Sequence, residues 1–520
     1  MGSFDVPDPL IPHFIAQHAR WQPRKAAVVE GERTVTWADF DAATNRIANG
    51  LRALGLERGS RLAVLMHNGI EMTEVLFGAG KAGVSVVPIN LSVNDAAVAA
   101  MIEDSGASAV AASGEQCLRI DALRRGPAPL EDLALLGHGA PGAPWIELAP
   151  WRDRASAAPP RVALTGEDEC NIIYSSGTTA LPKGIVHSHR CRVHWASDLA
   201  LALRYHGGAV TIISLGQYSN ISWVAMLSTV LVGGTLVVMP SFDAHRLLEH
   251  VARHRITHGA VVPVQLQRLL ECGETSRFDL ASLEAIMCCG SPLPPDVKRG
   301  AQAALGCALI ELYGLTEGII TTLAPEDFQR KLTSVGKPIA GQEVKLIDDA
   351  GREVERGAAG EIVGYGRLVM TGYHRRPDAT QEATWIDETG RRWLRTGDLG
   401  RLDEDGFLYI VDRKKDMILS GAQNVYPADI EHVMRGHPDV SDVAVIGVPS
   451  AKWGETPYAV VVPRAGATLD PGTLTEWTNA RVGRQQRIAG AALRDSLPRN
   501  PNGKVLKREL RAQYARVATS

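Results

Sequence analysis

The strongest constraint in the sequence is a polar loop between two strand-like segments. Residues 175–184 read S-S-G-T-T-A-L-P-K-G, and the apolar residues 171–174 and 185–186 beside them are typical of short buried strands. Glycine lets backbone N–H groups approach a ligand, hydroxyl groups donate hydrogen bonds, and Lys183 adds a positive charge. We therefore interpret this segment, called the phosphate loop below, as a site for an anionic phosphate.

Two alternatives exist for the phosphate loop. Gly, Ser, Thr and Pro are ordinary turn residues, so a polar hairpin turn is one of them. The other is a Walker A loop, which needs G-x-x-x-x-G-K-[ST] between a strand and a helix. Here Gly177 and Lys183 are spaced differently, no Ser or Thr follows the lysine, and a strand-like run comes next. The sequence therefore disfavours a P-loop NTPase.

Length and composition narrow the class of protein. At 520 residues the chain exceeds what one hydrophobic core supports, so two or more domains are expected. The 55 basic and 58 acidic residues give a net charge of −3, without the basic stripe that favours nucleic acid. No apolar run reaches the roughly 20 residues that span a bilayer, and residues 1–9 do not resemble a signal peptide. Because the seven cysteines are scattered, we predict a reduced, cytoplasmic protein without a membrane span.

Alternating helix and strand patterns predict an α/β fold. Thr36 is a candidate helix cap, and the helix it begins is expected to end near Gly55. Helical and strand patterns then alternate over residues 61–112 and again over residues 195–312. This spacing is typical of βαβ units with largely parallel strands, so we predict two α/β sheet subdomains.

The remaining segments predict how the chain divides. Residues 123–158 are rich in Pro, Gly and Ala and are expected to form a loop-rich connection, whereas residues 335–410 read as a small β-rich subdomain. We predict a large N-terminal domain over residues 1–412, a hinge at 413–415 and a small mobile α+β domain over 416–520.

A second group of chemical side chains lies at the end of a strand-like run. Residues 311–317 read E-L-Y-G-L-T-E, which brings together an aromatic ring, a hydroxyl and a carboxylate. These groups can stack on a base, contact a phosphate and hold Mg²⁺, respectively. A strand-end loop with a surface glutamate is the alternative. Residues 289–293, C-G-S-P-L, present a similar choice between a site loop and a simple turn.

Three segments further along place charged residues on predicted turns. R-T-G-D at 395–398 sets an aspartate in a tight turn, where a carboxylate can accept the hydroxyls of a ribose. D-R-K-K at 412–415 is a charge run, and P-R-N-P-N-G-K at 498–504 ends in Lys504. Each of them could be a solvated turn. A cation on such a loop could instead lower the barrier to joining a carboxylate and a phosphate, which are both anions.

In this order, the motifs resemble those of the adenylate-forming superfamily, which includes acyl-CoA synthetases, peptide-synthetase adenylation domains and luciferases. The resemblance covers nearly the whole chain and favours the acyl-CoA synthetase branch. One departure is Ala180, which stands where the family usually has glycine in the phosphate loop.

The resemblance implies that one Mg·ATP and coenzyme A contact these motifs. The implied cofactor-binding residues are Ser175, Ser176, Gly177, Thr178, Thr179, Lys183, Gly290, Ser291, Tyr313, Asp398, Arg413 and Gly421. Within this set, Tyr313 stacks on adenine, while Asp398 and Arg413 contact the ribose. Gly421 lies on the loop at 420–424 that resembles the lining of the thiol tunnel.

The resemblance also implies a reaction, in which a carboxylic acid, ATP and coenzyme A give acyl-CoA, AMP and pyrophosphate. Lys504, Thr316 and Glu317 are its implied catalytic residues, and Glu317 is also the ligand for Mg²⁺. Lys504 stabilises the attacking carboxylate, and Thr316 contacts the α-phosphate. The small domain then turns about Lys415 and admits the thiol of coenzyme A.

The chemical class of the acid is predicted from the residues that align with the family's acyl pocket. These residues are Tyr218, Ser219, Trp223 and Gly314. Amino-acid-activating members carry an aspartate in this region, and residues 217–223 contain none. Tyr218 stands where a histidine is common. The side chains here are more polar than those of a fatty-acid tunnel, and Trp223 would shorten such a tunnel. Both features favour an aromatic or medium-length acid.

Three other functions stay open at this point. A luciferase-like oxidase shares these motifs, and a ligase that acylates a carrier protein would use the same first half-reaction. A non-catalytic nucleotide-binding module is a different class of protein. The expected partners are a small carboxylic acid and coenzyme A, with no nucleic acid, and a homodimer is left open.

Overall fold

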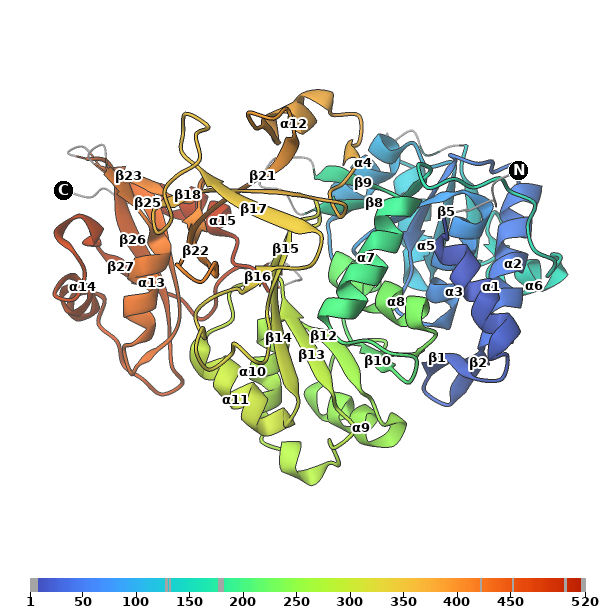
Figure 1. Cartoon of the computed structure of the whole chain (residues 1–520), viewed down its shortest axis with the longest axis horizontal. Coiled ribbons are helices and arrows are strands. Elements are labelled where there is room, and N and C mark those ends of the chain that lie inside the picture. Colours follow the sequence, from blue (N-terminus) through green and yellow to red (C-terminus); the bar gives the residue numbers. More distant parts are fainter. Residues whose placement is uncertain are drawn as a thin grey trace, which may run out of the picture. The chain divides into compact units, whose positions relative to one another are not determined.

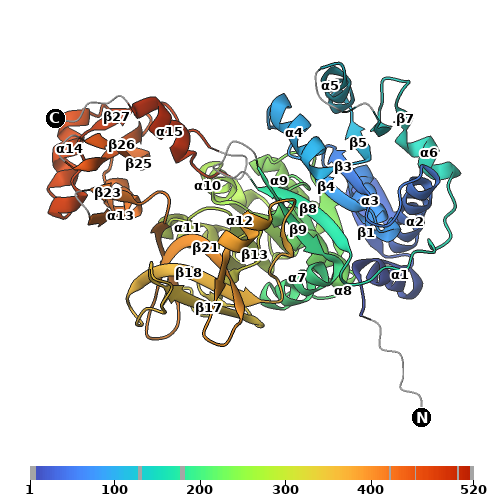
Figure 2. The same cartoon turned by 90° about the horizontal axis from the view of Figure 1, so that it is seen from above.

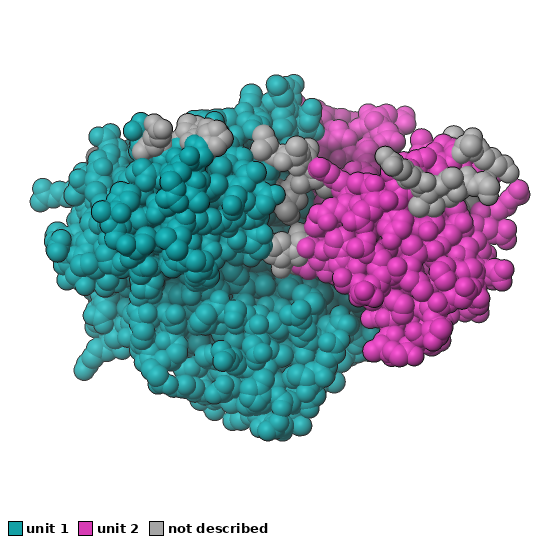
Figure 3. Space-filling model, turned by 180° about the vertical axis from the view of Figure 1, so that it is seen from behind, with its two compact units in different colours: residues 1–332, 338–343, 365–384 teal, residues 333–337, 344–364, 385–520 magenta. Residues whose placement is uncertain are grey.

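The chain forms two compact units (Figure 3). The computed structural model describes residues 8–126, 130, 132–175, 182–420, 423–450, 453–499 and 503–515. Unit 1 consists of residues 1–332, 338–343 and 365–384, and unit 2 of residues 333–337, 344–364 and 385–520. Each unit has its own hydrophobic core.

Unit 1 is built on two mostly parallel sheets (Figure 1). The first sheet has the strand order β16-β15-β14-β13-β12-β10-β11-β1-β2, and the second has the order β19-β9-β8-β4-β3-β5-β6-β7. The strands of the first sheet are β1 (Ala26–Glu30), β2 (Arg33–Thr36), β10 (Val210–Ile213), β11 (Thr235–Val238), β12 (His258–Val261), β13 (Ala285–Cys289), β14 (Ala308–Gly314), β15 (Ile320–Leu323) and β16 (Lys337–Pro338). Those of the second are β3 (Arg61–Leu65), β4 (Ser85–Pro88), β5 (Ala109–Ser113), β6 (Ala134–His138), β7 (Ile146–Glu147), β8 (Glu169–Ser175), β9 (Lys183–Ser188) and β19 (Gly372–Tyr373).

Helices connect most of these strands, as the predicted βαβ units require. They are α1 (Ile11–Trp21), α2 (Trp37–Ala53), α3 (Ile70–Ala82), α4 (Asp95–Ser105), α5 (Glu115–Arg124), α6 (Leu148–Arg154), α7 (His189–Ala202), α8 (Asn220–Val232), α9 (Ala244–His254), α10 (Pro263–Glu271), α11 (Pro295–Leu305) and α12 (Pro377–Glu382). The side chain of Thr36 caps α2 by accepting a hydrogen bond from the backbone N–H of Asp39, as predicted.

The core of unit 1 joins its two sheets. Every residue of α3 is buried, and α8 is buried from Ser222 to Val230. One core cluster contains Leu236 of the first sheet, Val64 of the second, Leu76 of α3 and Leu227 of α8. Helices that are buried on all sides need apolar residues around their whole circumference, which explains why α8 shows no amphipathic pattern.

The hairpin of β8 and β9 carries the phosphate loop. The two strands pair in antiparallel fashion, with Asn171 opposite His187 and Ser175 opposite Lys183. Residues 176–181, between the strands, lie outside the described residues. The predicted strand–loop–strand arrangement is confirmed by the two strands.

Unit 2 contains two further sheets. The first has the order β17-β18-β21-β20, with β22 beside β21, and the second has the order β24-β23-β26-β25, with β27 beside β26. The strands are β17 (Gln342–Ile347), β18 (Ala359–Gly366), β20 (Thr384–Ile386), β21 (Arg392–Leu402), β22 (Leu408–Arg413), β23 (Ile418–Ser420), β24 (Gln423–Val425), β25 (Val440–Ser450), β26 (Gly454–Pro463) and β27 (Ala491–Leu493). Helices α13 (Pro427–Arg435), α14 (Pro471–Asn479) and α15 (Lys507–Tyr514) pack beside the second sheet (Figure 2).

The predicted fold class is confirmed, with one local correction. The sequence patterns predict strands over residues 61–65 and 285–289 and a helix over residues 427–435, and these bounds agree with β3, β13 and α13. The prediction of a loop-rich connection over residues 123–158 is wrong, because β6, β7 and α6 lie within it. The many small residues of this segment give only weak periodicity, so the buried strand β6 was not predicted. Leu135 and Leu136 of this strand belong to the core. The predicted domain bounds at 412 and 416 stay a prediction.

Two predictions made from the composition of the chain, on its cysteines and on membrane spans, can be compared directly with the structure. All seven cysteines are free thiols, and six of them are buried. Burial raises the pKa of the Cys289 thiol to about 12, so this group is inert at neutral pH. Within the described part of the chain, no helix combines the length and the apolar character needed to cross a membrane.

A buried ion pair joins β14 to α11, and its removal leads to a testable prediction about stability. Lys298 and Glu311 are 2% and 5% exposed and form a salt bridge, and the Lys298 ammonium also donates to the carbonyl of Leu332. The variant Lys298→Met leaves the carboxylate of Glu311 buried without its cation. We expect the free energy of unfolding, measured in urea, to fall by about 3–5 kcal/mol.

The pH dependence of this loss distinguishes a charge effect from a packing effect. Burial already raises the pKa of Glu311, and removing Lys298 raises it further. Because the unpaired carboxyl can then be neutralised by a proton, the variant should lose less stability at pH 5 than at pH 8. The double variant Lys298→Met/Glu311→Leu, which removes both charges, should recover most of the loss. A loss that is independent of pH would contradict this account.

Candidate active site

The first group of predicted site residues lies beside the phosphate loop in unit 1. The Lys183 ammonium lies 4.8 Å from the centre of the Tyr373 ring, which is cation–π distance. The hydroxyl of Tyr373 donates a hydrogen bond of 2.9 Å to Oε1 of Glu317. One tyrosine thus connects the lysine of the phosphate loop with the carboxylate predicted to bind metal.

Tyr373 was not predicted from the sequence. It lies on β19, which pairs with β9 so that Tyr373 is opposite Ile185. Burial and the Glu317 carboxylate raise the pKa of its hydroxyl, which therefore stays protonated as a hydrogen-bond donor. No local pattern places residue 373 beside residue 317, because the contact arises from the pairing of β19 with β9 and from the N–H group of Met370, which donates to the carbonyl of Glu317.

The Y-G-L-T-E segment spans the turn between β14 and β15. Tyr313 and Gly314 are the last residues of β14, so they lie within the strand and not after it as predicted. A Cβ atom on Gly314 would lie 2.4 Å from the carbonyl oxygen of Ile319, which excludes larger residues. The carbonyl of Thr316 accepts a hydrogen bond of 2.8 Å from Nε2 of His187. The turn is therefore anchored to β9, the second strand of the phosphate-loop hairpin.

The predicted adenine-side loop follows β13. Gly290 has φ of 101°, a left-handed conformation that side chains rarely adopt, and Ser291 beside it is half-buried. Because β13 and β14 are neighbouring parallel strands, Gly290 and Tyr313 lie at the same edge of the sheet.

Three of the predicted acyl-pocket residues, Tyr218, Ser219 and Trp223, lie around the start of α8, whereas Gly314 lies on β14. The Ser219 hydroxyl caps this helix by accepting from the backbone N–H of Ile221. Tyr218 is half-buried and packs against the core, and Trp223 is 3% exposed. The Tyr218 ring also lies over Gly216, where a Cβ atom would be 2.1 Å from the ring. Ser219 therefore has a structural role in addition to the one predicted for it.

The second group of predicted residues lies in unit 2. Asp398 on β21 is directly opposite Arg413 on β22, and Nε of Arg413 lies 3.0 Å from Oδ1 of Asp398 in an ion pair. Asp398 is 3% exposed. The predicted tight turn at residues 395–398 is wrong. These residues belong to β21, and a bulge with Gly397 at φ of 69° explains the turn-like sequence.

Lys504 is held within the same unit by a small β-bridge. Arg499 pairs with Val505 in antiparallel fashion, and Gly503 has φ of 80° immediately before the lysine. The pKa of Lys504 is lowered to about 7, first by burial and then by the positive charge of Arg413, with Asp398 opposing the change. Burial also lowers the pKa of Lys415, the predicted hinge residue. Asp398, Arg413, Lys415 and Lys504 thus share one electrostatic environment.

Several predicted residues cannot be compared with the structure. Ser176, Gly177, Thr178 and Thr179 of the phosphate loop and Gly421 of the predicted thiol tunnel lie outside the described residues, as do Ala180 and Asn502. Ser175 is described as the last residue of β8, but only by its backbone.

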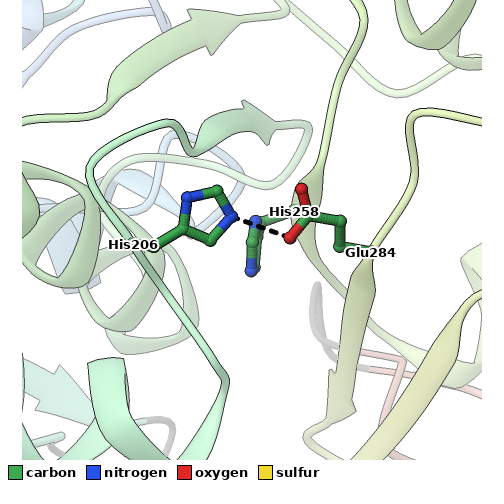
Figure 4. A group of neighbouring side chains, drawn as sticks. All are labelled: His206, His258 and Glu284. Carbon is green, nitrogen blue, oxygen red and sulfur yellow. Dashed lines mark hydrogen bonds and ion pairs between the residues drawn. The ribbon is translucent and has the colours of Figure 1, made fainter.

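Three side chains of the kinds that can bind a metal ion lie close together at the edge of the first sheet opposite to Gly290 and Tyr313 (Figure 4). His206, His258 and Glu284 have ligand atoms within 4.8 Å of one another, and His258 and Glu284 lie at the amino ends of β12 and β13. The Gly208 N–H group donates to Nδ1 of His206, so the proton of this ring lies on Nε2, 2.7 Å from Glu284. Although the residue types suit zinc, this arrangement is a histidine–glutamate hydrogen bond.

Comparison with known proteins assigns the family. Residues 15–374 match the family described as AMP-binding enzyme, and residues 429–504 match its C-terminal domain. The chain is 35% identical over 515 residues to a long-chain fatty acid–CoA ligase of Mycobacterium tuberculosis, which covers 96% of this chain and 98% of that protein. It is 34% identical over 514 residues to a feruloyl-CoA synthase of Amycolatopsis, with 96% and 98% covered.

A solved structure agrees with this assignment. The o-succinylbenzoate CoA synthetase of Bacillus subtilis, in complex with its acyl-adenylate intermediate, matches with a TM-score of 0.83 and 29% identity over 96% of this chain and 97% of that one. The chain therefore belongs to the AMP-binding enzyme family, and within this adenylate-forming superfamily to the acyl-CoA synthetase branch of AMP-forming acid–thiol ligases.

The environment of Lys504 leads to a titration prediction. In the enzyme without nucleotide, its amine should lose its proton with a midpoint near pH 7, against about 10.4 for an unperturbed lysine. Competitive acylation of the amine across pH 5–11, read from the peptide that contains residue 504, measures this midpoint. Because the phosphates of Mg·ATP favour the charged amine, adding Mg·ATP with a carboxylic acid should raise it. A midpoint above about pH 10 without nucleotide would contradict the described environment.

Proposed function

We propose that this acid–CoA ligase acts on an aromatic or medium-chain carboxylic acid through two half-reactions. In the first, a carboxylate oxygen attacks the α-phosphorus of ATP, which forms an acyl–phosphate bond and releases pyrophosphate. In the second, the thiol sulfur of coenzyme A attacks the acyl carbon, which forms the thioester, releases AMP and gives the thiol proton to solvent.

The contact that most strongly supports this proposal joins Lys183, Tyr373 and Glu317. Lys183 is positioned to neutralise phosphate charge, and the Tyr373 hydroxyl fixes the Glu317 carboxylate beside it. Carboxylate oxygens are ligands that Mg²⁺ prefers beside phosphates, so Glu317 suits this metal. When bound, Mg²⁺ would offset the negative charge of the phosphate groups. Thr316, on the same turn, is proposed to contact the α-phosphate.

The residues of unit 2 are proposed to bind the ribose and to assist the attack. Asp398 is proposed to accept the ribose hydroxyls while its ion pair with Arg413 holds the carboxylate in place. Lys504 is proposed to stabilise the attacking carboxylate and the α-phosphate together. For the second half-reaction, we propose that residues 416–520 rotate about Lys415 and bring the 420–424 loop to the thiol.

The class of acid is inferred from the residues around α8. Trp223 and Tyr218 place aromatic rings in this region, whereas Ser219 and Asn220 make it more polar than a fatty-acid tunnel requires. Residues 217–223 contain no carboxylate that could pair with an α-amino group, which disfavours amino acids. The similarity to a feruloyl-CoA synthase supports an aromatic acid, and the similarity to a fatty acid–CoA ligase supports an aliphatic one.

Pyrophosphate release across a panel of acids tests the proposal. With Mg·ATP, release should depend on the acid, and aromatic and C6–C10 acids should exceed amino acids and C16 acids. Adding coenzyme A should convert each activated acid to its thioester. The variant Lys504→Ala should lose about 10²- to 10³-fold in the rate of adenylate formation, by the scale of losing one group that stabilises a developing charge.

Controls separate the alternatives. Lys504→Ala should still bind ATP and should still convert a synthetic acyl adenylate to acyl-CoA, since the lysine is proposed to act in the first half-reaction alone. Oxygen consumption in place of thioester formation would identify a luciferase-like oxidase. Thioester formation on a carrier protein but not on coenzyme A would identify a different acceptor. ATP binding without acid-dependent pyrophosphate release would refute the proposal.

A further inference from the structure

Arg192, on α7, is a buried cation that the reaction described above does not use. It is 0% exposed, and its guanidinium donates three hydrogen bonds. Nε donates to Oδ1 of Asn171 at 2.7 Å, Nη1 to Oδ1 of Asn220 at 2.9 Å, and Nη2 lies 3.2 Å from Nδ1 of His187. A planar guanidinium carries its donors on three nitrogen atoms, so it can bridge three acceptors that lie in different directions.

The three acceptors belong to three different parts of unit 1. Asn171 and His187 are directly opposite each other on β8 and β9, at the base of the phosphate-loop hairpin. Asn220 is the first residue of α8, the helix that carries the predicted acyl pocket. Arg192 therefore holds the two hairpin strands and the acyl-pocket helix at fixed distances from one another.

His187 extends this network to the Y-G-L-T-E turn. Because arginine can only donate, Nδ1 of His187 must accept, and the ring proton must lie on Nε2. Nε2 then donates to the carbonyl oxygen of Thr316 at 2.8 Å. Burial and the positive charge of Arg192 hold the pKa of His187 well below its usual value, so the ring stays neutral in this tautomer at physiological pH.

Packing alone does not explain a cation at this position. Among the described residues, the polar partners of Arg192 are Asn171, Asn220 and His187 and not carboxylates, and its charge lies 5.2 Å from the ring centres of both Trp195 and Trp223. Burial lowers its pKa to about 10, so it remains charged at neutral pH. A buried charge costs free energy compared with an apolar side chain of similar size. The network must therefore contribute something besides stability.

We propose that Arg192 is a positioning residue for the adenylation half-reaction. It sets the distance between the acyl-pocket helix and the phosphate loop, and it orients Thr316 through the tautomer of His187. This inference rests on the proposed function, since it assigns the acid to α8 and the α-phosphate to Thr316. One consequence is that an acid bound at the start of α8 affects the geometry at Thr316 through Asn220, Arg192 and His187.

The test compares Arg192→Met with Lys81→Met. Lys81 is also a buried cation of unit 1, but it pairs with Asp41 and lies outside this network. Both variants leave the buried polar groups that bind the cation without their partner, so both should unfold at lower temperature than the wild type. At a temperature where circular dichroism shows both to be folded, Arg192→Met should lose about 10²-fold in kcat for acid-dependent ATP–pyrophosphate exchange, the cost typical of a misplaced reacting group. Lys81→Met should keep the kcat of the wild type.

A pH profile separates positioning from general damage. Among the charged groups that the structure describes, Arg192 is the one that acts on His187, so its removal should raise the pKa of this ring. The decline of exchange at low pH should therefore begin at a higher pH in Arg192→Met than in the wild type. The double variant Arg192→Met/His187→Gln, whose amide does not titrate, should lack this decline.

Each outcome of these experiments supports or contradicts the positioning role of Arg192. If Arg192→Met does not fold, Asn220→Ala and His187→Leu each remove one acceptor and should lower kcat with little change in the KM for ATP. Unchanged kcat in a folded Arg192 variant, or an equal loss in Lys81→Met, would overturn the positioning role. Wild-type exchange must be present in the same assay. Its absence would refute the proposed function, whereas an active wild type with an unaffected Arg192→Met refutes only this inference.

Discussion

The antiparallel pairing of β8 with β9 is the interaction on which the arrangement of unit 1 depends. It fixes both ends of the phosphate loop, with Ser175 opposite Lys183, and it provides the edge on which β19 brings Tyr373 to Glu317. At the base of the same hairpin, His187 anchors the turn that carries Thr316. Backbone pairing thus positions side chains that are far apart in the sequence, because a ladder of hydrogen bonds holds the strands in one register.

Buried charged side chains have different partners in the two units. In unit 1, buried charges are distributed among neutral acceptors and aromatic rings, as for Arg192, or paired, as for Lys298 and Glu311. In unit 2, Asp398 and Arg413 are paired across two strands, and their neighbourhood lowers the pKa of Lys504. A lysine whose charge depends on its surroundings suits a step in which two anions must be brought together, since the anions themselves favour the charged amine.

Local patterns were sufficient for most of the fold and for the motifs of the site. The periodicity of residues 61–65 and 285–289 predicted β3 and β13 within the observed bounds, because buried parallel strands are short apolar runs. Residues 395–398 were predicted as a turn because a bulge and a turn both use a left-handed glycine. Tyr373, His187 and Arg192 could not be predicted, since their contacts arise from strands and helices that are distant in the sequence. The helical pattern of α7 likewise gave no sign that Arg192 is buried.

The central proposal is that the Y-G-L-T-E turn of unit 1 binds the acyl adenylate that this ligase forms. The most direct measurement is a crystal structure of the enzyme with a non-hydrolysable acyl-adenylate analogue made from an acid that the enzyme activates. The account predicts that Tyr313 stacks on the adenine and that Thr316 lies within hydrogen-bond distance of the group that replaces the α-phosphate. An analogue bound away from Tyr313 and Thr316 would contradict it.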